Sequence, residues 1–289
     1  MALFQESTRE THNIFFTNGN NLYETIKEDG SFGNGAVFFL LEKIPALNRR
    51  IYTGEYVINR HETVYSFISR MFQGDTVIRK ITIPEGYTVQ MIVEKLNNED
   101  SLKGVIENIS EEGSLFPSTY FYKKNDSKNS IIQKMKGEME KVIRELFSKK
   151  TKEYIRDTII MASIIEKETK TAKERPFVAS VFKNRIKKNM RLQSDPTVIY
   201  ALSNGYGKID HPLTRNELLF NSPYNTYRNK GLPPSPICCP SKESIISALN
   251  PANTDYLYFV AENDDSHIFS SDYKIHVKNI QGIKKRKNR

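Results

Sequence analysis

The sequence predicts an α+β fold in which a small strand–helix module precedes a larger mixed α/β domain. The first part of the chain repeats one pattern three times: a short β-branched or aromatic run, a polar turn and an amphipathic helical segment. These units predict strands at 14–16, 56–58 and 81–83, and helices at 22–27, 64–72 and 89–96. Strand–helix units of this size suit an α+β module. We therefore expect a module at residues 1–98 and a larger domain at 99–289.

The larger domain is expected to be mainly helical and to end on a hairpin. An apolar stripe over 130–149 predicts a long helix that packs on a core. Residues 154–169 are apolar nearly all round, which predicts a buried helix. Capping patterns and first-turn prolines predict the helices that follow. These later helices and the closing hairpin are expected at 176–189, from 195 onwards, and at 256–260 with 267–270.

The hydrophobic content and the net charge limit the possible partners but do not identify one. The chain has 289 residues, 38% of them hydrophobic, which is enough for a substantial core. A net charge of +9 favours an anionic partner such as nucleic acid, anionic lipid or a cell-wall polymer. No nucleic-acid-binding motif accompanies this charge, so we expect no nucleic-acid partner. Much of the excess lies in the basic segment 284–287, which we interpret as a solvated terminus.

Two further features limit the class of protein. The longest apolar run, Ala36–Leu41, is far shorter than the roughly 18 residues that a membrane span needs. The first residues also lack the layout of a signal peptide, so we expect a soluble chain. Cys238 and Cys239 are adjacent, and neighbouring cysteines rarely pair with each other. We therefore expect no disulfide, no metal site and no cofactor.

Two glutamates at the end of the predicted buried helix are the strongest candidates for chemistry. Burying a carboxylate costs several kcal/mol unless the group is paired or protonated. Such a site raises the pKa of a glutamate, as a general acid requires. Glu166 and Glu168 point about 200° apart on a helix, so only one of them can face a given pocket. The alternative is that both are solvated residues at a fraying helix end.

Polar and aromatic residues gather downstream of these glutamates. Asn184 and Arg185 lie on the next predicted helix, and Gln193 and Asp195 follow its end. The loop 221–240 contains five prolines and is too long for a simple connection. Amides, hydroxyls and aromatic faces suit a neutral sugar chain. A phosphate-binding glycine-rich loop and a G-x-S-x-G nucleophile motif are both absent.

Several of these segments together resemble the YceG-like family of endolytic murein transglycosylases. The matching segments are Ala162–Thr169, Glu174–Arg185, Met190–Tyr200, Ser222–Tyr227, Gly231–Pro234, Asn250–Ala252, Tyr256–Ala261, Ile83–Gly86 and Leu115–Pro117. They follow the order of the family, and the resemblance covers nearly all of the chain and is dense from about 160 to 270. The strand–helix units of the first module also resemble LysM-like modules, which bind glycan, although a generic α+β unit explains them equally well.

The resemblance implies a reaction and a set of site residues. The family cuts peptidoglycan strands internally between N-acetylmuramic acid and N-acetylglucosamine, and leaves a 1,6-anhydro end. It implies that Glu168 is the catalytic group, acting first as acid and then as base. The side chains expected to bind the substrate are Asn184, Gln193, Asp195, Asn225, Tyr227 and His267. Two of these have a structural alternative, Asp195 as a helix cap and His267 as a packing residue, and Glu166 is expected to anchor its helix.

The resemblance also implies a setting and leaves one alternative open. The expected partners are peptidoglycan glycan strands and membrane-bound peptidoglycan synthases, at the outer face of the cytoplasmic membrane of a bacterium. The family usually begins with a transmembrane anchor, which this chain does not show. It also has no glycine in the turn 262–266, and Ser118 and Ser241 replace the usual Asp and Gly. The alternative function is a catalytically inactive glycan-binding scaffold of the cell-wall synthesis machinery.

Overall fold

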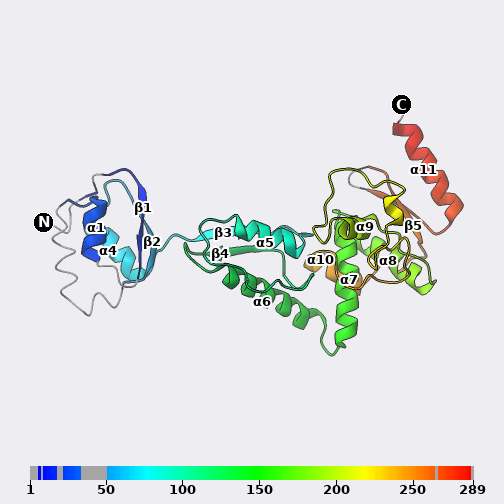
Figure 1. Cartoon of the computed structure of the whole chain (residues 1–289), viewed down its shortest axis with the longest axis horizontal. Helices are drawn as coiled ribbons and strands as arrows, with labels where there is room; N and C mark the ends of the chain where they lie inside the picture. Colours follow the sequence, from blue (N-terminus) through cyan, green and yellow to red (C-terminus); the bar gives the residue numbers. More distant parts are fainter. Residues whose placement is uncertain (1–5, 8, 18–21, 34–50, 264–265, 288–289) are drawn as a thin grey trace. The chain divides into compact units, whose positions relative to one another are not determined.

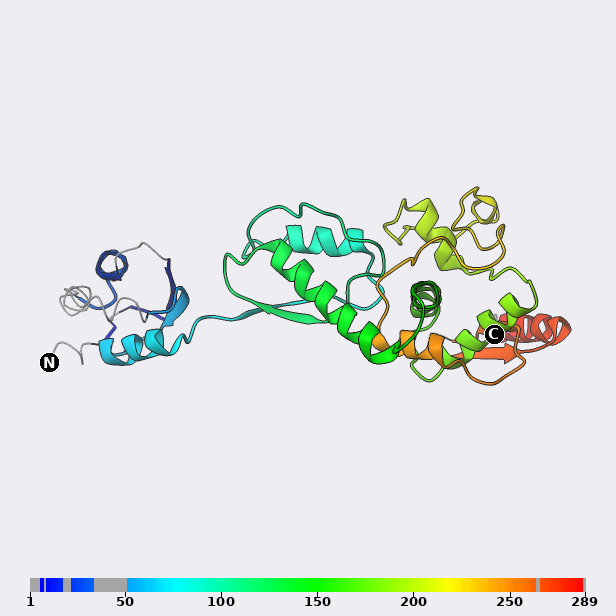
Figure 2. The ribbon, with the colours of Figure 1, turned by 90° about the horizontal axis from the view of Figure 1, so that it is seen from below.

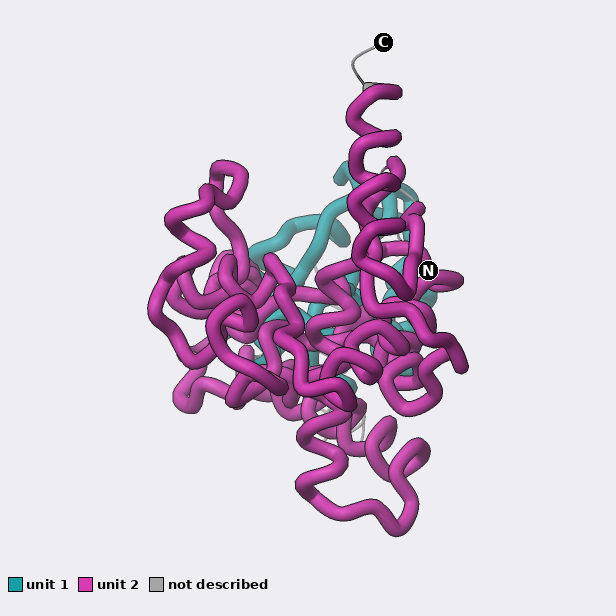
Figure 3. Tube along the Cα trace, turned by 90° about the vertical axis from the view of Figure 1, so that its right-hand side faces the viewer, with its two compact units in different colours: residues 1–81, 100–103, 121–127 teal, residues 82–99, 104–120, 128–289 magenta. Residues whose placement is uncertain are grey.

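The computed structural model describes residues 6–7, 9–17, 22–33, 51–263 and 266–287. In this part of the chain, strands and helices alternate up to β4, a run of helices follows, and the short strands pair two by two, which confirms an α+β fold. The chain forms two compact units, coloured separately in Figure 3. Unit 1 holds residues 1–81, 100–103 and 121–127, and unit 2 holds residues 82–99, 104–120 and 128–289. Compactness alone does not define a functional domain, so the boundary between 98 and 99 stays a prediction.

The described core of unit 1 is built around the strand pair of β1 and β2. Its described elements are β1 (His12–Phe16), α1 (Leu22–Asp29), β2 (Gly54–Ile58) and α4 (Val64–Gln73) (Figure 1). β1 and β2 are antiparallel, with Phe16 opposite Gly54. Because side chains alternate along a strand, one face of the pair can supply the core. That core consists of Ile14, Phe16, Ile26, Phe32, Tyr56, Ile58, Val64, Phe67, Ile68 and Met71.

Unit 2 contains most of the described chain. The strands β3 (Arg79–Thr82) and β4 (Thr119–Tyr122) pair with each other, and the division between the units falls within both. The helices are α5 (Val89–Asn97), α6 (Lys128–Leu146), α7 (Lys152–Glu168), α8 (Arg175–Lys187), α9 (Asp195–Leu202), the 3₁₀ turn η2 (Glu217–Leu219), α10 (Lys242–Leu249) and α11 (Tyr273–Lys287). The last strands are β5 (Tyr258–Ala261) and β6 (His267–Ser270).

Helix α7 is the centre of unit 2, and α8, α9 and α10 pack against it (Figures 1 and 2). Residues 158–165 of α7 are buried without a break, which confirms the predicted buried helix. One side of α7 enters a cluster with Val178 and Phe182 of α8, and another enters a cluster with Met139 and Val142 of α6. Each such side chain contributes about 1.5–3 kcal/mol when fully buried. The glutamates at the end of α7 are therefore held by a well-packed helix.

The hairpin near the end of the chain forms as predicted. β5 and β6 are antiparallel, with Ala261 opposite His267, and α11 contacts both strands. Residues 264–265 of the turn between them lie outside the described residues, as does the apolar run Ala36–Leu41. None of the described helices combines the length and apolar character that a membrane span requires.

Candidate active site

Glu168 is the last residue of α7, and its surroundings shift the pKa of its carboxyl group. Its side chain is half-buried, and the Ser194 hydroxyl donates a hydrogen bond of 2.5 Å to its Oε1. Burial raises the pKa of Glu168 to about 7; the hydrogen bond from Ser194 lowers this pKa, the charge of Asp195 raises it, and Arg185 lowers it. Near neutral pH both forms of the carboxyl group are populated. The group can therefore release a proton and later accept one.

Glu168 lines a cavity of about 290 Å³ within unit 2. The lining residues are Glu168, Arg185, Leu192, Gln193, Asp195, Tyr227, Phe259 and His276. Three of the predicted substrate-binding residues, Gln193, Asp195 and Tyr227, therefore share a cavity with the predicted catalytic glutamate. The lining combines carboxylate, amide, hydroxyl and aromatic groups, which suits a sugar chain. Among the described residues, no cluster of three or more His, Cys, Asp or Glu is arranged to hold a metal ion.

A network of buried hydroxyl groups fixes Ser194. The backbone N–H of Ser194 donates to Thr226 Oγ1 at 2.9 Å, and the Thr197 hydroxyl donates to the Ser194 carbonyl at 2.7 Å. The hydroxyls of Thr197 and Thr226 lie 2.9 Å apart. All three residues are at most 1% exposed. Because buried polar groups need partners, this network holds Ser194 in the position from which it reaches Glu168.

Arg185 shapes the wall of the cavity next to Gln193. Its guanidinium donates to the carbonyls of Leu257 and Leu192, both at 2.7 Å, and to Gln193 Oε1 at 3.4 Å. Gln193 has a φ of +52°, a left-handed conformation that is unfavourable for a residue with a side chain. A hydrogen bond of 3.1 Å from its backbone N–H to the Thr226 carbonyl helps to maintain it. Arg185 thus orients the amide that faces the cavity.

Asp195 and Tyr227 form a pair at the cavity. The Tyr227 hydroxyl donates to Asp195 Oδ1 at 2.5 Å. Asp195 is the first residue of α9, and the cap is Ser194, so the interpretation of Asp195 as a helix cap is wrong. Asn225 is fully buried and accepts a hydrogen bond of 2.9 Å from the backbone N–H of Tyr227. The pair is therefore held from α9 on one side and from the proline-rich loop on the other.

The other predicted residues lie in the scaffold around the cavity rather than among the described residues that line it. The Asn225 amide donates to two carbonyls of its own loop, at 3.0 and 2.7 Å. The Asn184 amide donates to the carbonyls of Thr254 and Tyr256, at 2.8 and 3.0 Å. His267 binds Glu174 through its Nδ1 at 2.6 Å and through its backbone N–H at 2.8 Å. Contact of these residues with substrate stays a prediction.

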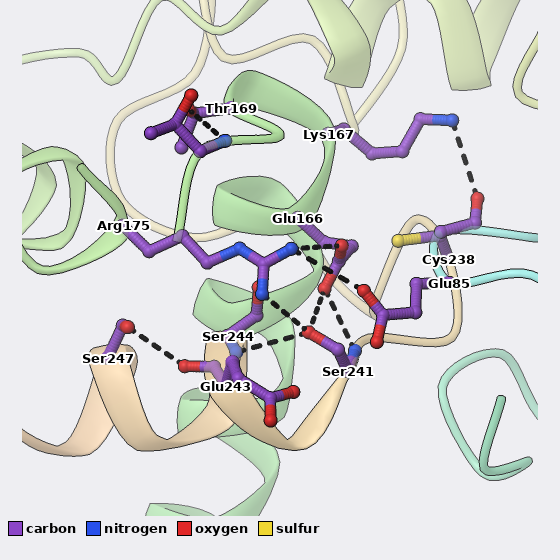
Figure 4. Close-up of polar contacts among 12 residues, drawn as sticks. Glu85, Glu166, Lys167, Thr169, Arg175, Cys238, Ser241, Glu243, Ser244 and Ser247 are labelled. Carbon is purple, nitrogen blue, oxygen red and sulfur yellow. Dashed lines mark hydrogen bonds and ion pairs between the residues drawn. The ribbon is translucent and has the colours of Figure 1, made fainter. Parts of the chain in front are cut away.

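Glu166 has strong partners of its own (Figure 4). Its Oε1 lies 3.1 Å from Arg175 Nη2, and both side chains are at most 7% exposed. Its Oε2 accepts hydrogen bonds from the Ser241 backbone N–H at 2.9 Å and from the Ser241 hydroxyl at 2.5 Å. Figure 4 also shows Arg175 reaching Glu85, at 3.5 Å. Glu166 therefore anchors the end of α7 to α8 and to the start of α10, as expected.

Comparison with known proteins shows the family to which this chain belongs. The model of the YceG-like family matches residues 17–282. The chain belongs to the YceG-like family. It is 32% identical over 268 residues to the endolytic murein transglycosylase of Bacillus subtilis strain 168, covering 78% of this chain and 71% of that protein. It is 27% identical over 315 residues to the endolytic murein transglycosylase of Streptococcus pneumoniae serotype 2, covering 91% of this chain and 56% of that protein.

A solved structure of the family supports the fold. The crystal structure of a yceG-like protein from Listeria monocytogenes is similar, with a TM-score of 0.58 and 29% sequence identity. The match covers 94% of this chain and 99% of that one. The chain spans just over half the length of the pneumococcal relative.

Sequence reasoning missed several residues of this YceG-like site. Ser194 contacts Glu168, and Arg185, Leu192, Phe259 and His276 line the cavity. Arg185 is visible in the sequence as a neighbour of Asn184, without a role. A charged residue shortly after the mainly apolar segment 178–182, which is buried in α8, is one signal that could have identified it. Ser194 and His276 carry no such local signal, because only the folded chain brings them to Glu168.

Proposed function

We propose that this chain is an endolytic peptidoglycan lytic transglycosylase that cleaves glycan strands between N-acetylmuramic acid and N-acetylglucosamine and leaves 1,6-anhydro-N-acetylmuramic acid ends. The observation that carries the proposal is the half-buried Glu168, whose pKa is raised to about 7 in a cavity lined by amide, hydroxyl and aromatic groups. The names of the relatives in Bacillus and Streptococcus support the same activity.

In this mechanism Glu168 serves both proton transfers. The protonated carboxyl group gives its proton to the glycosidic oxygen as the bond from that oxygen to the muramoyl anomeric carbon breaks. The muramoyl C6 oxygen then bonds to the anomeric carbon, and the Glu168 carboxylate takes the hydroxyl proton. Gln193 and Tyr227 line the cavity and would hold the sugar during both steps by hydrogen bonding and stacking.

Asp195 raises the alternative of an ordinary hydrolase, because such an enzyme uses two carboxyl groups. Both Glu168 and Asp195 line the cavity. However, one Asp195 oxygen already accepts the Tyr227 hydroxyl at 2.5 Å. We assign Asp195 to holding Tyr227 and to raising the pKa of Glu168 through its negative charge, rather than to attack on the sugar.

We further propose that the enzyme ends the elongation of nascent glycan strands. Its partners are then peptidoglycan strands and the membrane-bound synthases that make them, at the outer face of the cytoplasmic membrane. The module at residues 1–98 would bind glycan in the manner of LysM-like modules. The net charge of +9 is suited to an anionic envelope surface.

The deciding experiment compares the wild type, Glu168→Gln and a matched control with intact peptidoglycan as substrate. Glu153→Gln is the control, because Glu153 is exposed on the first turn of the same helix. Mass spectrometry of the released products identifies the new ends. We expect anhydromuramoyl ends from the wild type and Glu153→Gln, and a loss of at least about 100-fold in Glu168→Gln.

Each other result points to a different function. Reducing ends in place of anhydro ends indicate a hydrolase and give Asp195 a direct role. Binding of peptidoglycan without any cleavage by the wild type indicates a glycan-binding scaffold. Equal cleavage by the wild type and Glu168→Gln excludes Glu168 as the acid and base.

A further inference from the structure

His276 lines the same cavity as Glu168, and the mechanism above gives it no role. It lies in the first turn of α11, where its backbone N–H donates to the Asp272 carbonyl at 3.0 Å. The Asp272 side chain also accepts hydrogen bonds from the backbone N–H groups of Lys274 and Ile275, at 2.7 and 3.2 Å. This capped turn fixes the position of the imidazole.

The ring of His276 is packed against an aromatic side chain. It stacks on Tyr258, with ring centroids 5.1 Å apart and an interplanar angle of 23°. The Arg185 guanidinium lies 5.4 Å from the centre of the same tyrosine ring. Burial and the positive charge of Arg185 lower the pKa of His276, so the imidazole is neutral near pH 7. A neutral imidazole has one N–H donor and one acceptor nitrogen.

The two ring nitrogens of His276 are in different situations. Nδ1 is shielded from solvent and has no hydrogen-bond partner among the described residues. A proton on Nδ1 would leave a buried N–H donor without a partner, and orphaned buried N–H groups are rare in folded proteins. The favoured tautomer therefore carries its proton on Nε2. The polar edge of the ring that remains for the cavity is this Nε2–H group.

We propose that His276 is a substrate-binding residue that donates a hydrogen bond from Nε2 to an oxygen of the bound glycan. The proposal rests on the proposed function, since it takes the glycan as the ligand of this cavity. Hydroxyl and N-acetyl groups of the glycan supply acceptor oxygens throughout the strand. His276 then acts with Gln193 and Tyr227, which line the same cavity, to hold the sugar near Glu168.

Three substitutions separate this role from simple packing. His276→Phe keeps a ring to stack on Tyr258 and removes both nitrogens. His276→Gln places an amide N–H close to the position of Nε2, whereas His276→Asn places one close to Nδ1. Lys274→Ala is the matched control, because Lys274 is exposed in the same turn. Thermal unfolding of each variant shows whether it is folded.

Binding is measured separately from cleavage. Purified glycan strands are titrated into each variant in the Glu168→Gln background, and KM and kcat are measured in the otherwise unchanged enzyme. We expect about tenfold weaker binding for His276→Phe and His276→Asn, and a loss of at most about threefold for His276→Gln. Lys274→Ala should bind like its parent. For His276→Phe and His276→Asn, KM should rise with little change in kcat.

Two results would overturn the proposal. Unchanged binding by His276→Phe would show that the ring acts by shape and that no donor is needed. Equal loss in His276→Phe and His276→Gln would show that a donor at the position of Nε2 does not support binding. If the expected binding pattern is found but the parent enzyme makes no anhydro ends, the proposal for His276 stands and the proposed function fails. The two conclusions are therefore tested independently.

Discussion

The hydrogen bond from Ser194 to Glu168 controls how easily the carboxyl group that we propose as the catalytic acid and base loses its proton. At 2.5 Å the Ser194 hydroxyl donates to Glu168 Oε1, which stabilises the ionised form and lowers the pKa against the effect of burial. A hydrogen bond to a charged group contributes about 1.5–3 kcal/mol, and one pKa unit corresponds to about 1.4 kcal/mol. Water can replace part of this interaction at a half-buried group. We therefore expect Ser194→Ala to raise the pKa of Glu168 by about one unit.

The pH dependence of kcat/KM measures this change. A proton donor must be protonated at the start of the reaction, so kcat/KM falls as the pH rises through its pKa. From the rate of anhydromuramoyl release, we expect the midpoint of this pH dependence at about pH 7 for the wild type and at about pH 8 for Ser194→Ala. Ser148→Ala, at an exposed serine, is the control. A midpoint in folded Ser194→Ala that stays in place or moves to lower pH refutes the reasoning.

Three further predictions concern the acidic residues Asp195, Glu166 and Glu112. Asp195→Asn removes a charge that raises the pKa of Glu168, so the same midpoint should move below about pH 7, opposite to the effect at Ser194. Glu166→Gln breaks an ion pair with Arg175 in which both side chains are at most 7% exposed; urea unfolding should show a loss of about 3 kcal/mol. Burial raises the pKa of Glu112 from 4.5 to about 7. The contribution of Glu112 to the free energy of unfolding is therefore fully present below about pH 4.5 and is lost as the pH rises towards 7. The free energy of unfolding should therefore differ less between about pH 5 and about pH 8 for Glu112→Gln than for the wild type.

The helix that carries both glutamates is predictable because its signal is local. Apolar residues on all its faces identify a buried helix, and the expected range 154–169 compares with Lys152–Glu168 in the structure. The difference at the start arises because Thr151 caps the helix, its side chain accepting the Tyr154 backbone N–H. The strand–helix units of the first hundred residues are predictable for the same reason.

The cavity is less predictable because it depends on packing between distant segments. Arg185 reaches its wall by donating to the carbonyl of Leu257, 72 positions along the chain. His276 reaches it because α11 contacts β5 and β6. For Asp195, a difference of one residue in the helix start decides the outcome: Ser194 is the cap, and Asp195 lines the cavity. Sequence patterns locate helix ends only to within a few residues, so they cannot settle such a question.

Glu166 and Glu168 show how two similar residues acquire different chemistry. Helical geometry turns them about 200° apart, so they meet different neighbours. Glu166 meets the Arg175 guanidinium and two donors of Ser241, which together compensate a buried negative charge. Among the described residues, Glu168 accepts a hydrogen bond from the Ser194 hydroxyl, and burial and the negative charge of Asp195 disfavour its ionised form despite the charge of Arg185. The protein therefore gives the Glu166 carboxylate a cation and two hydrogen-bond donors and gives Glu168 less compensation, and the raised pKa of Glu168 makes its proton available near neutral pH.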